Sequence, residues 1–121
     1  MIKLIIYFSF LFLTLFANAQ EDAVLGDDFL ERQLKAQSYR AKLILKFEAL
    51  EEGKRLEQLD KASKFSSEAS ASYGTEAYTA ARKSYHEAAQ LAPKRDEYFF
   101  NYALSLYKEK KYKWSLVYLK M

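Results

Sequence analysis

The amino-acid sequence predicts an all-α fold made of antiparallel helix-turn-helix repeats, preceded by one or two longer helices. Apolar residues recur at steps of three and four along most of the chain, as on one face of an α-helix. Glycine or proline marks several of the breaks between these segments, and no segment shows the alternation typical of a strand. The expected helices span about residues 28–52, 54–73, 76–91, 96–109 and 111–121.

The first expected helix begins near Asp28, which precedes Phe29 and stands three residues before Glu31. This is an N-cap arrangement that places acidic groups at the positive end of a helix dipole. Two neighbouring apolar stripes give the helix a wide apolar face, and Gly53 is its expected C-cap. We expect the helix to cover the N-terminal end of the helices that follow. An elongated hairpin that dimerises is the alternative.

The second expected helix begins at Lys54 and ends where Gly74 and Thr75 break the pattern. The third carries Ala81, Tyr85 and Ala88 at steps of four and three, and Pro93 follows. Small and large side chains on one face let a neighbouring helix approach closely. Proline cannot continue a helix, so the fourth helix can begin near Asp96.

This pattern recurs 34 residues later in the chain. The recurrence pairs Phe65 with Phe99, Ala69 with Ala103, Tyr78 with Tyr112, Ala81 with Ser115, and Tyr85 with Leu119. In these residues the chain resembles the tetratricopeptide repeat (TPR) family, whose unit is a helix-turn-helix. An alternative is that alanines and aromatic residues at helical spacing belong to some other helical hairpin.

The resemblance covers about Ala62 to Met121 and implies the start of a right-handed superhelix. It divides the chain into an N-terminal helical segment at 28–61, a repeat at 62–95 and a truncated repeat at 96–121. Glu68 and Ser72 depart from the family pattern in the first helix of the earlier repeat. The residues expected to pack between helices are Phe65, Ala69, Tyr78, Ala81, Tyr85, Ala88, Pro93, Phe99, Ala103, Tyr112, Ser115 and Leu119.

The resemblance also implies a partner-binding groove, because the first helix of each unit lines the inner face in this family. The candidate binding residues are Tyr73, Glu97, Phe100, Asn101, Leu104, Tyr107 and Lys108, with Ser63, Ser66 and Ser70 in the earlier unit. Peptide-binding members often hold a C-terminal carboxylate with Asn and Lys, and here only Asn101 and Lys108 are of those types. An alternative is that the aromatic residues pack against a following helix.

The first 19 residues have the layout of a secretory signal peptide: Lys3, an apolar run from Leu4 to Phe16, and the small residues Ala17 and Ala19. Cleavage after Ala19 would leave an acidic linker at 20–27 and export the chain to the periplasm, the cell envelope or the medium. The alternative is an uncleaved segment that contacts the membrane. With no cysteine in the sequence, disulfides are excluded.

Little in the composition points to catalysis. His86 is the only histidine, so a multi-histidine metal site is excluded, and three glycines give no phosphate-binding loop. A net charge of +3 does not indicate a nucleic-acid partner. No enzyme activity, metal, cofactor or specific small-molecule ligand is expected. A lysine cluster at 108–113 has two interpretations. It binds an anionic lipid or polymer, or it only keeps an exposed edge of the protein soluble.

The last expected helix ends at Met121 without a capping helix, which would leave bare the apolar side chains of Val117 and Tyr118, with Leu116 and Leu119. A longer array, a partner or self-association through this helix would cover them. We therefore expect an exported, non-catalytic TPR-like interaction or scaffold module, in one reading the N-terminal part of a longer protein. The alternatives are an oligomeric helical-bundle or coiled-coil structural protein of the cell envelope and, third, an enzyme.

Overall fold

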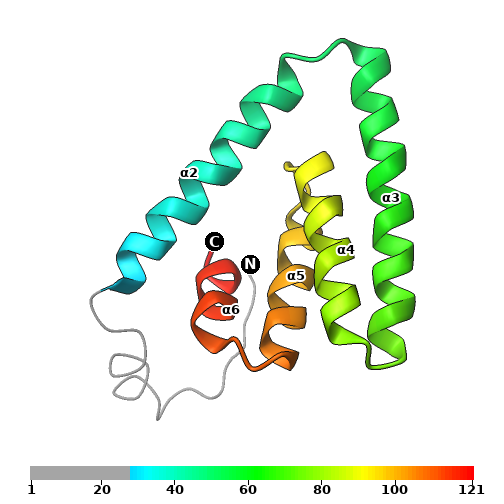
Figure 1. The fold of residues 1–121 in the computed structure, drawn as a ribbon. Helices are drawn as coiled ribbons and strands as arrows, with labels where there is room; N and C mark the ends of the chain where they lie inside the picture. Colours follow the sequence, from blue (N-terminus) through cyan, green and yellow to red (C-terminus); the bar gives the residue numbers. More distant parts are fainter. Residues whose placement is uncertain (1–27) are drawn as a thin grey trace.

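The structure is a computed structural model that describes residues 28–121, and this part of the chain is helical without strands (Figure 1). The expected all-α fold is therefore confirmed. The expected signal peptide at 1–19 and acidic linker at 20–27 lie outside the described residues. The helices are α2 (Asp28–Glu48), α3 (Glu52–Gly74), α4 (Tyr78–Leu91), α5 (Asp96–Lys108) and α6 (Tyr112–Leu119).

The break between α2 and α3 comes earlier than the sequence suggested. Gly53 was expected to cap the C-terminus of the first helix, but it lies in the first turn of α3. The guanidinium of Arg55 instead donates hydrogen bonds to the carbonyls of Glu48 and Leu50. A side chain from α3 thus satisfies carbonyl groups at the end of α2, where a left-handed glycine was expected.

Helices α3 to α6 lie side by side in one antiparallel layer (Figure 1). The interfaces between them are built on small residues, since Ala81, Ala88 and Ala103 are completely buried. The rings of Tyr85 and Phe99 are buried beside these alanines. Fully buried alanines let two helix backbones approach closely while the larger rings fill the remaining space.

The other residues expected to pack between helices follow this pattern with two exceptions. Ala69, Pro93 and Ser115 are buried, while Phe65 and Tyr78 are partly buried. Tyr112 and Leu119, in contrast, are 45 % and 38 % exposed. Both are terminal residues of the eight-residue helix α6, where fewer neighbours surround a side chain.

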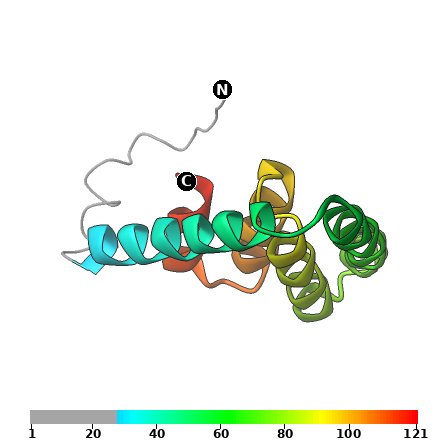
Figure 2. The ribbon, with the colours of Figure 1, turned by 90° about the horizontal axis from the view of Figure 1, so that it is seen from above.

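Helix α2 covers a different end of the layer from the one expected. It leaves the upper end of α3 and runs diagonally to α6 (Figures 1 and 2). It packs against α6 and also contacts α4, so the expectation that it covers the N-terminal end is wrong. With α2 and α5 beside α6, Val117 is fully buried and Leu116 and Tyr118 are partly buried, whereas Leu119 remains 38 % exposed.

Polar contacts fasten α2 to the C-terminal part of the chain, in addition to the burial of Ala36 and Phe47. Arg40 donates one hydrogen bond to the carbonyl oxygen of Pro93 (2.8 Å) and another to Asp96 Oδ1 (2.6 Å). Its guanidinium also lies 4.5 Å from the ring centroid of Phe99. Nearer the N-terminus of α2, Gln33 Nε2 donates to the carbonyl oxygen of Lys120 (3.2 Å). These partners belong to the C-terminal half of the chain, and no hydrophobic pattern in α2 could reveal them.

The turns after α3 and α5 adopt the same backbone conformation, at positions that are 34 residues apart in the sequence. Glu76 and Lys110 both have a φ of 65°, which is the left-handed region. In each turn two amide groups bond back to the preceding helix, as in a Schellman motif. The bonds are Glu76 N to Tyr73 O (3.0 Å), Ala77 N to Ser72 O (2.8 Å), Lys110 N to Tyr107 O (2.9 Å) and Lys111 N to Leu106 O (2.9 Å).

We predict that Ala81→Leu lowers the free energy of unfolding by about 1–3 kcal/mol, because the larger side chain must separate two closely packed helices. The matched control is Ala80→Leu, since Ala80 lies one residue away on the exposed side of α4. Urea unfolding followed by circular dichroism measures both. Equal effects of the two substitutions would contradict the packing described above.

We also predict that Glu76→Gly raises the free energy of unfolding by about 0.5–1 kcal/mol. A left-handed backbone costs a non-glycine residue about 1–2 kcal/mol, which exceeds the extra entropy that glycine gives the unfolded chain. Glu57→Gly, at an exposed position within α3, should instead destabilise by about 1 kcal/mol. Thermal unfolding of both variants tests the opposite signs.

Candidate functional site

The sequence-predicted binding residues of the second unit lie together on one face of α5. Phe100 and Tyr107 are 50 % and 54 % exposed, and Leu104 between them is partly buried. The helical steps place Glu97, Asn101 and Lys108 on the same face. Together these side chains form an exposed strip of apolar and aromatic surface with polar groups along it. We call this strip, made of Glu97, Phe100, Asn101, Leu104, Tyr107 and Lys108, the α5 face.

The candidate residues of the first unit are not part of this strip. Tyr73 on α3 is partly buried, packs against the cluster around Ala69 and Tyr85, and meets the Tyr78 ring edge-on at 5.2 Å. Lys108 Nζ lies 5.8 Å from the same Tyr78 ring. Tyr73 and Lys108 are therefore linked through Tyr78, at the start of α4.

The three serines expected in the groove differ in how far they are exposed to solvent. Ser63 and Ser70 are exposed and Ser66 is partly buried. Burial raises the pKa of the Tyr85 phenol, and a hydrogen bond with Ser70 opposes that rise. Ser70 thus contributes to the interface between α3 and α4. The exposed aromatic rings of the predicted groove lie on the α5 face.

Aromatic rings from several helices form a cluster beneath α2, which the sequence pattern did not predict. His86 on α4 lies between Tyr39 and Tyr102, with centroid distances of 6.4 Å and 5.1 Å. Burial lowers the pKa of His86, and burial raises the pKa of Tyr118 to about 12. The amide of Gln90 donates a hydrogen bond to the Tyr39 hydroxyl. The packing of α4 against α5 brings His86 to Tyr102, and the docking of α2 adds Tyr39 to the cluster.

A charged cluster holds the turn between α5 and α6 against α4. Glu109 is only 11 % exposed at its side chain and forms an ion pair with Arg82. Thr79 Oγ1 donates a second hydrogen bond to Glu109, at 2.6 Å. Burial by itself would raise the pKa of Glu109, but the hydrogen bonds from Thr79 and Arg82 and the positive charge of Arg82 lower it.

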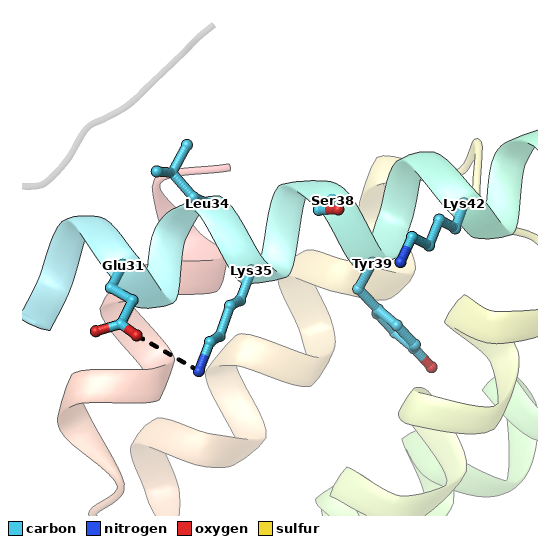
Figure 3. A pocket seen from close by; sticks show the side chains of 6 residues that line it. All are labelled: Glu31, Leu34, Lys35, Ser38, Tyr39 and Lys42. Carbon is cyan, nitrogen blue, oxygen red and sulfur yellow. Dashed lines mark ion pairs between the residues drawn. The ribbon is translucent and has the colours of Figure 1, made fainter.

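Two hollows lie away from the α5 face. The first is a shallow depression along α2 in which Lys35 and Lys42 flank Tyr39 (Figure 3). Lys35 is paired there with Glu31 at 3.7 Å. The second lies where Phe47 of α2 faces Leu59 of α3, near Arg95. Both are open to solvent and neither gathers a catalytic set of side chains.

Among residues 28–121, no three acidic, histidine or cysteine side chains are grouped to hold a metal ion. The described helices also include none long and apolar enough to cross a bilayer. The chain matches no protein-family model, no curated protein and no solved structure. Its function must therefore be argued from its own surfaces.

We predict that Glu109→Gln lowers the free energy of unfolding near pH 7 and that this difference from the wild type vanishes in acid. The folded state lowers the pKa of Glu109, so the ionised group stabilises the fold above its unfolded pKa of about 4.3. That contribution is lost as the pH falls through the lower, folded pKa.

Urea unfolding at a series of pH values between neutrality and strong acid measures the effect. Glu57→Gln, at an exposed position on α3, is the control and should change little at any pH. A constant difference between Glu109→Gln and the wild type across the series would contradict the charge-based explanation.

Proposed function

We propose that the chain is an exported, non-catalytic interaction module of the TPR type, which binds a protein or peptide segment on the α5 face. The observation that carries the proposal is the exposure of Phe100 and Tyr107 beside Asn101 and Lys108. Exposed aromatic rings next to polar groups are typical of protein-binding surfaces. The paired turns displaced by 34 residues support the assignment to a repeat family.

The α5 face suits an extended segment with some apolar side chains. Phe100 and Tyr107 offer aromatic area at two places along the helix, with Leu104 between them. The side-chain amide of Asn101 can both donate to and accept from a peptide backbone. Lys108 supplies a positive charge at one end of the face, suited to a carboxylate of the bound segment.

The rest of the fold keeps this face in a fixed shape. The turn that follows α5 is held to α4 through Glu109, Arg82 and Thr79. The start of α5 is held to α2 by the bond between Asp96 and Arg40. With both ends of α5 fastened, less conformational entropy is lost when a partner binds.

A second candidate function is an oligomeric structural protein of the cell envelope that associates through α2. The observation that favours it is the outward face of that helix, where Leu30, Leu34 and Leu45 are 70 %, 65 % and 69 % exposed. A stripe of leucines along a helix is the usual contact surface of a helical bundle. Helicity or sedimentation that depends on protein concentration would favour this function over a monomeric binding module.

We predict that the chain beginning at Gln20 selects peptides from a displayed library and that Phe100→Ala with Tyr107→Ala abolishes the selection. Truncating a hot-spot residue at a binding interface costs about 2 kcal/mol or more, and the exposed rings of Phe100 and Tyr107 are the expected hot spots of the α5 face. The control, Leu30→Ala on α2, removes an apolar side chain of similar exposure and should leave peptide binding unchanged.

Isothermal titration with a selected peptide gives the affinities. Asn101→Ala should weaken binding less than the aromatic pair, since it removes hydrogen bonds but little buried area. Peptide binding that survives the change of both Phe100 and Tyr107 would refute the assignment of the α5 face.

A further inference from the structure

The turn between α5 and α6 concentrates positive charge at one edge of the molecule. Lys108, Lys110, Lys111 and Lys113, here called the basic turn, all have exposed side chains. Figure 1 shows this turn at the lower edge of the helix layer, clear of α2. We infer that the basic turn is a docking surface for an anionic lipid bilayer.

The one acidic residue within the basic turn does not offset these charges. The Glu109 side chain is turned inward, where its charge is paired with that of Arg82 and its carboxylate accepts a hydrogen bond from Thr79. Lys111 Nζ is 3.9 Å from the same carboxylate but its side chain remains 52 % exposed. The sequence places the single acidic residue Glu109 among four lysines, and the fold exposes the lysine side chains while it turns the glutamate inward.

Aromatic rings flank the lysines. Tyr107 and Tyr112 meet edge-on across the turn, with their centroids 5.3 Å apart. Tyr112 is 45 % exposed, and Trp114, farther along α6, is 38 % exposed although Arg32 of α2 lies 5.0 Å from its ring centroid. Tyrosine and tryptophan favour the headgroup level of a bilayer, because they combine an apolar ring with a polar group.

The shape of the turn favours a broad anionic surface over an acidic peptide. Its backbone is fixed by the two bonds from Lys110 N and Lys111 N, so the lysines are held at a protruding edge. The two hollows described above lie elsewhere, along α2 and between α2 and α3. Lysines act as point charges without a fixed binding fork, which suits the dispersed phosphates of a leaflet.

The test is vesicle co-sedimentation with the chain beginning at Gln20, which retains every residue that builds the described fold and lacks the apolar leader. The probes are vesicles of phosphatidylcholine alone and of phosphatidylcholine mixed with phosphatidylglycerol. Binding should require the anionic lipid and weaken as salt is raised. Trp114 is the only tryptophan, so a blue shift of its fluorescence gives a second readout.

The variant that tests the surface is Lys110→Gln, Lys111→Gln and Lys113→Gln together. Partitioning onto anionic vesicles should fall about a hundredfold, since each lysine near an anionic leaflet contributes about a fivefold increase. The matched control replaces Lys54, Lys61 and Lys64 of α3 by glutamine, which changes the net charge equally at other exposed positions. Circular dichroism checks that both variants remain helical.

Equal loss of vesicle binding in the two triple variants would overturn the inference, because net charge rather than the turn would then be responsible. Equal binding to neutral vesicles, or binding only to a soluble polyanion such as polyglutamate, would also overturn it. The first triple variant leaves Phe100, Leu104 and Tyr107 intact, so peptide binding on the α5 face should persist. Failure of one proposal is thereby distinguishable from failure of the other.

Discussion

Close approach of neighbouring helices through alanine is the constraint on which the rest of the structure depends. Ala69, Ala81, Ala88 and Ala103 have no exposed surface, and the largest side chains that are fully buried are only of the size of Val117 and Pro93. The core therefore combines backbones in close contact at these alanines with large side chains that are nearly fully buried, such as Phe99 and Tyr98 at 3 % and 4 % exposed. Dispersion contacts between well-packed atoms then stabilise a small layer that has no disulfide.

Ser115 shows how strictly this constraint operates. It takes the place in α6 that Ala81 takes in α4, and it is likewise buried. Its hydroxyl donates a hydrogen bond of 2.8 Å to the carbonyl oxygen of Ala103, so the buried polar group is satisfied. A small polar residue can replace alanine in the stripe because it is small and because a carbonyl is within reach.

Helix α2 is attached in a different way from the other helices. Its contacts include hydrogen bonds from Arg40 and Gln33, an ion pair between Glu48 and Lys94, and rings gathered around Tyr39. Such contacts specify where the helix lies, and the leucines on its outer face stay exposed. The α5 face and the basic turn, which adjoin at Lys108, are likewise left uncovered.

The sequence by itself determined the helical class, all the helices described and the small-residue stripes, because helical periodicity, proline and glycine act locally. It also placed Phe100, Asn101 and Tyr107 on one helix face, since that follows from spacing alone. Tertiary structure decided what α2 covers, because the partners of Arg40 and Tyr39 are distant in the chain. It likewise decided that Glu109 turns inward among lysines, since the position of Arg82 on α4 attracts it, and sequence spacing contains no signal for that pairing.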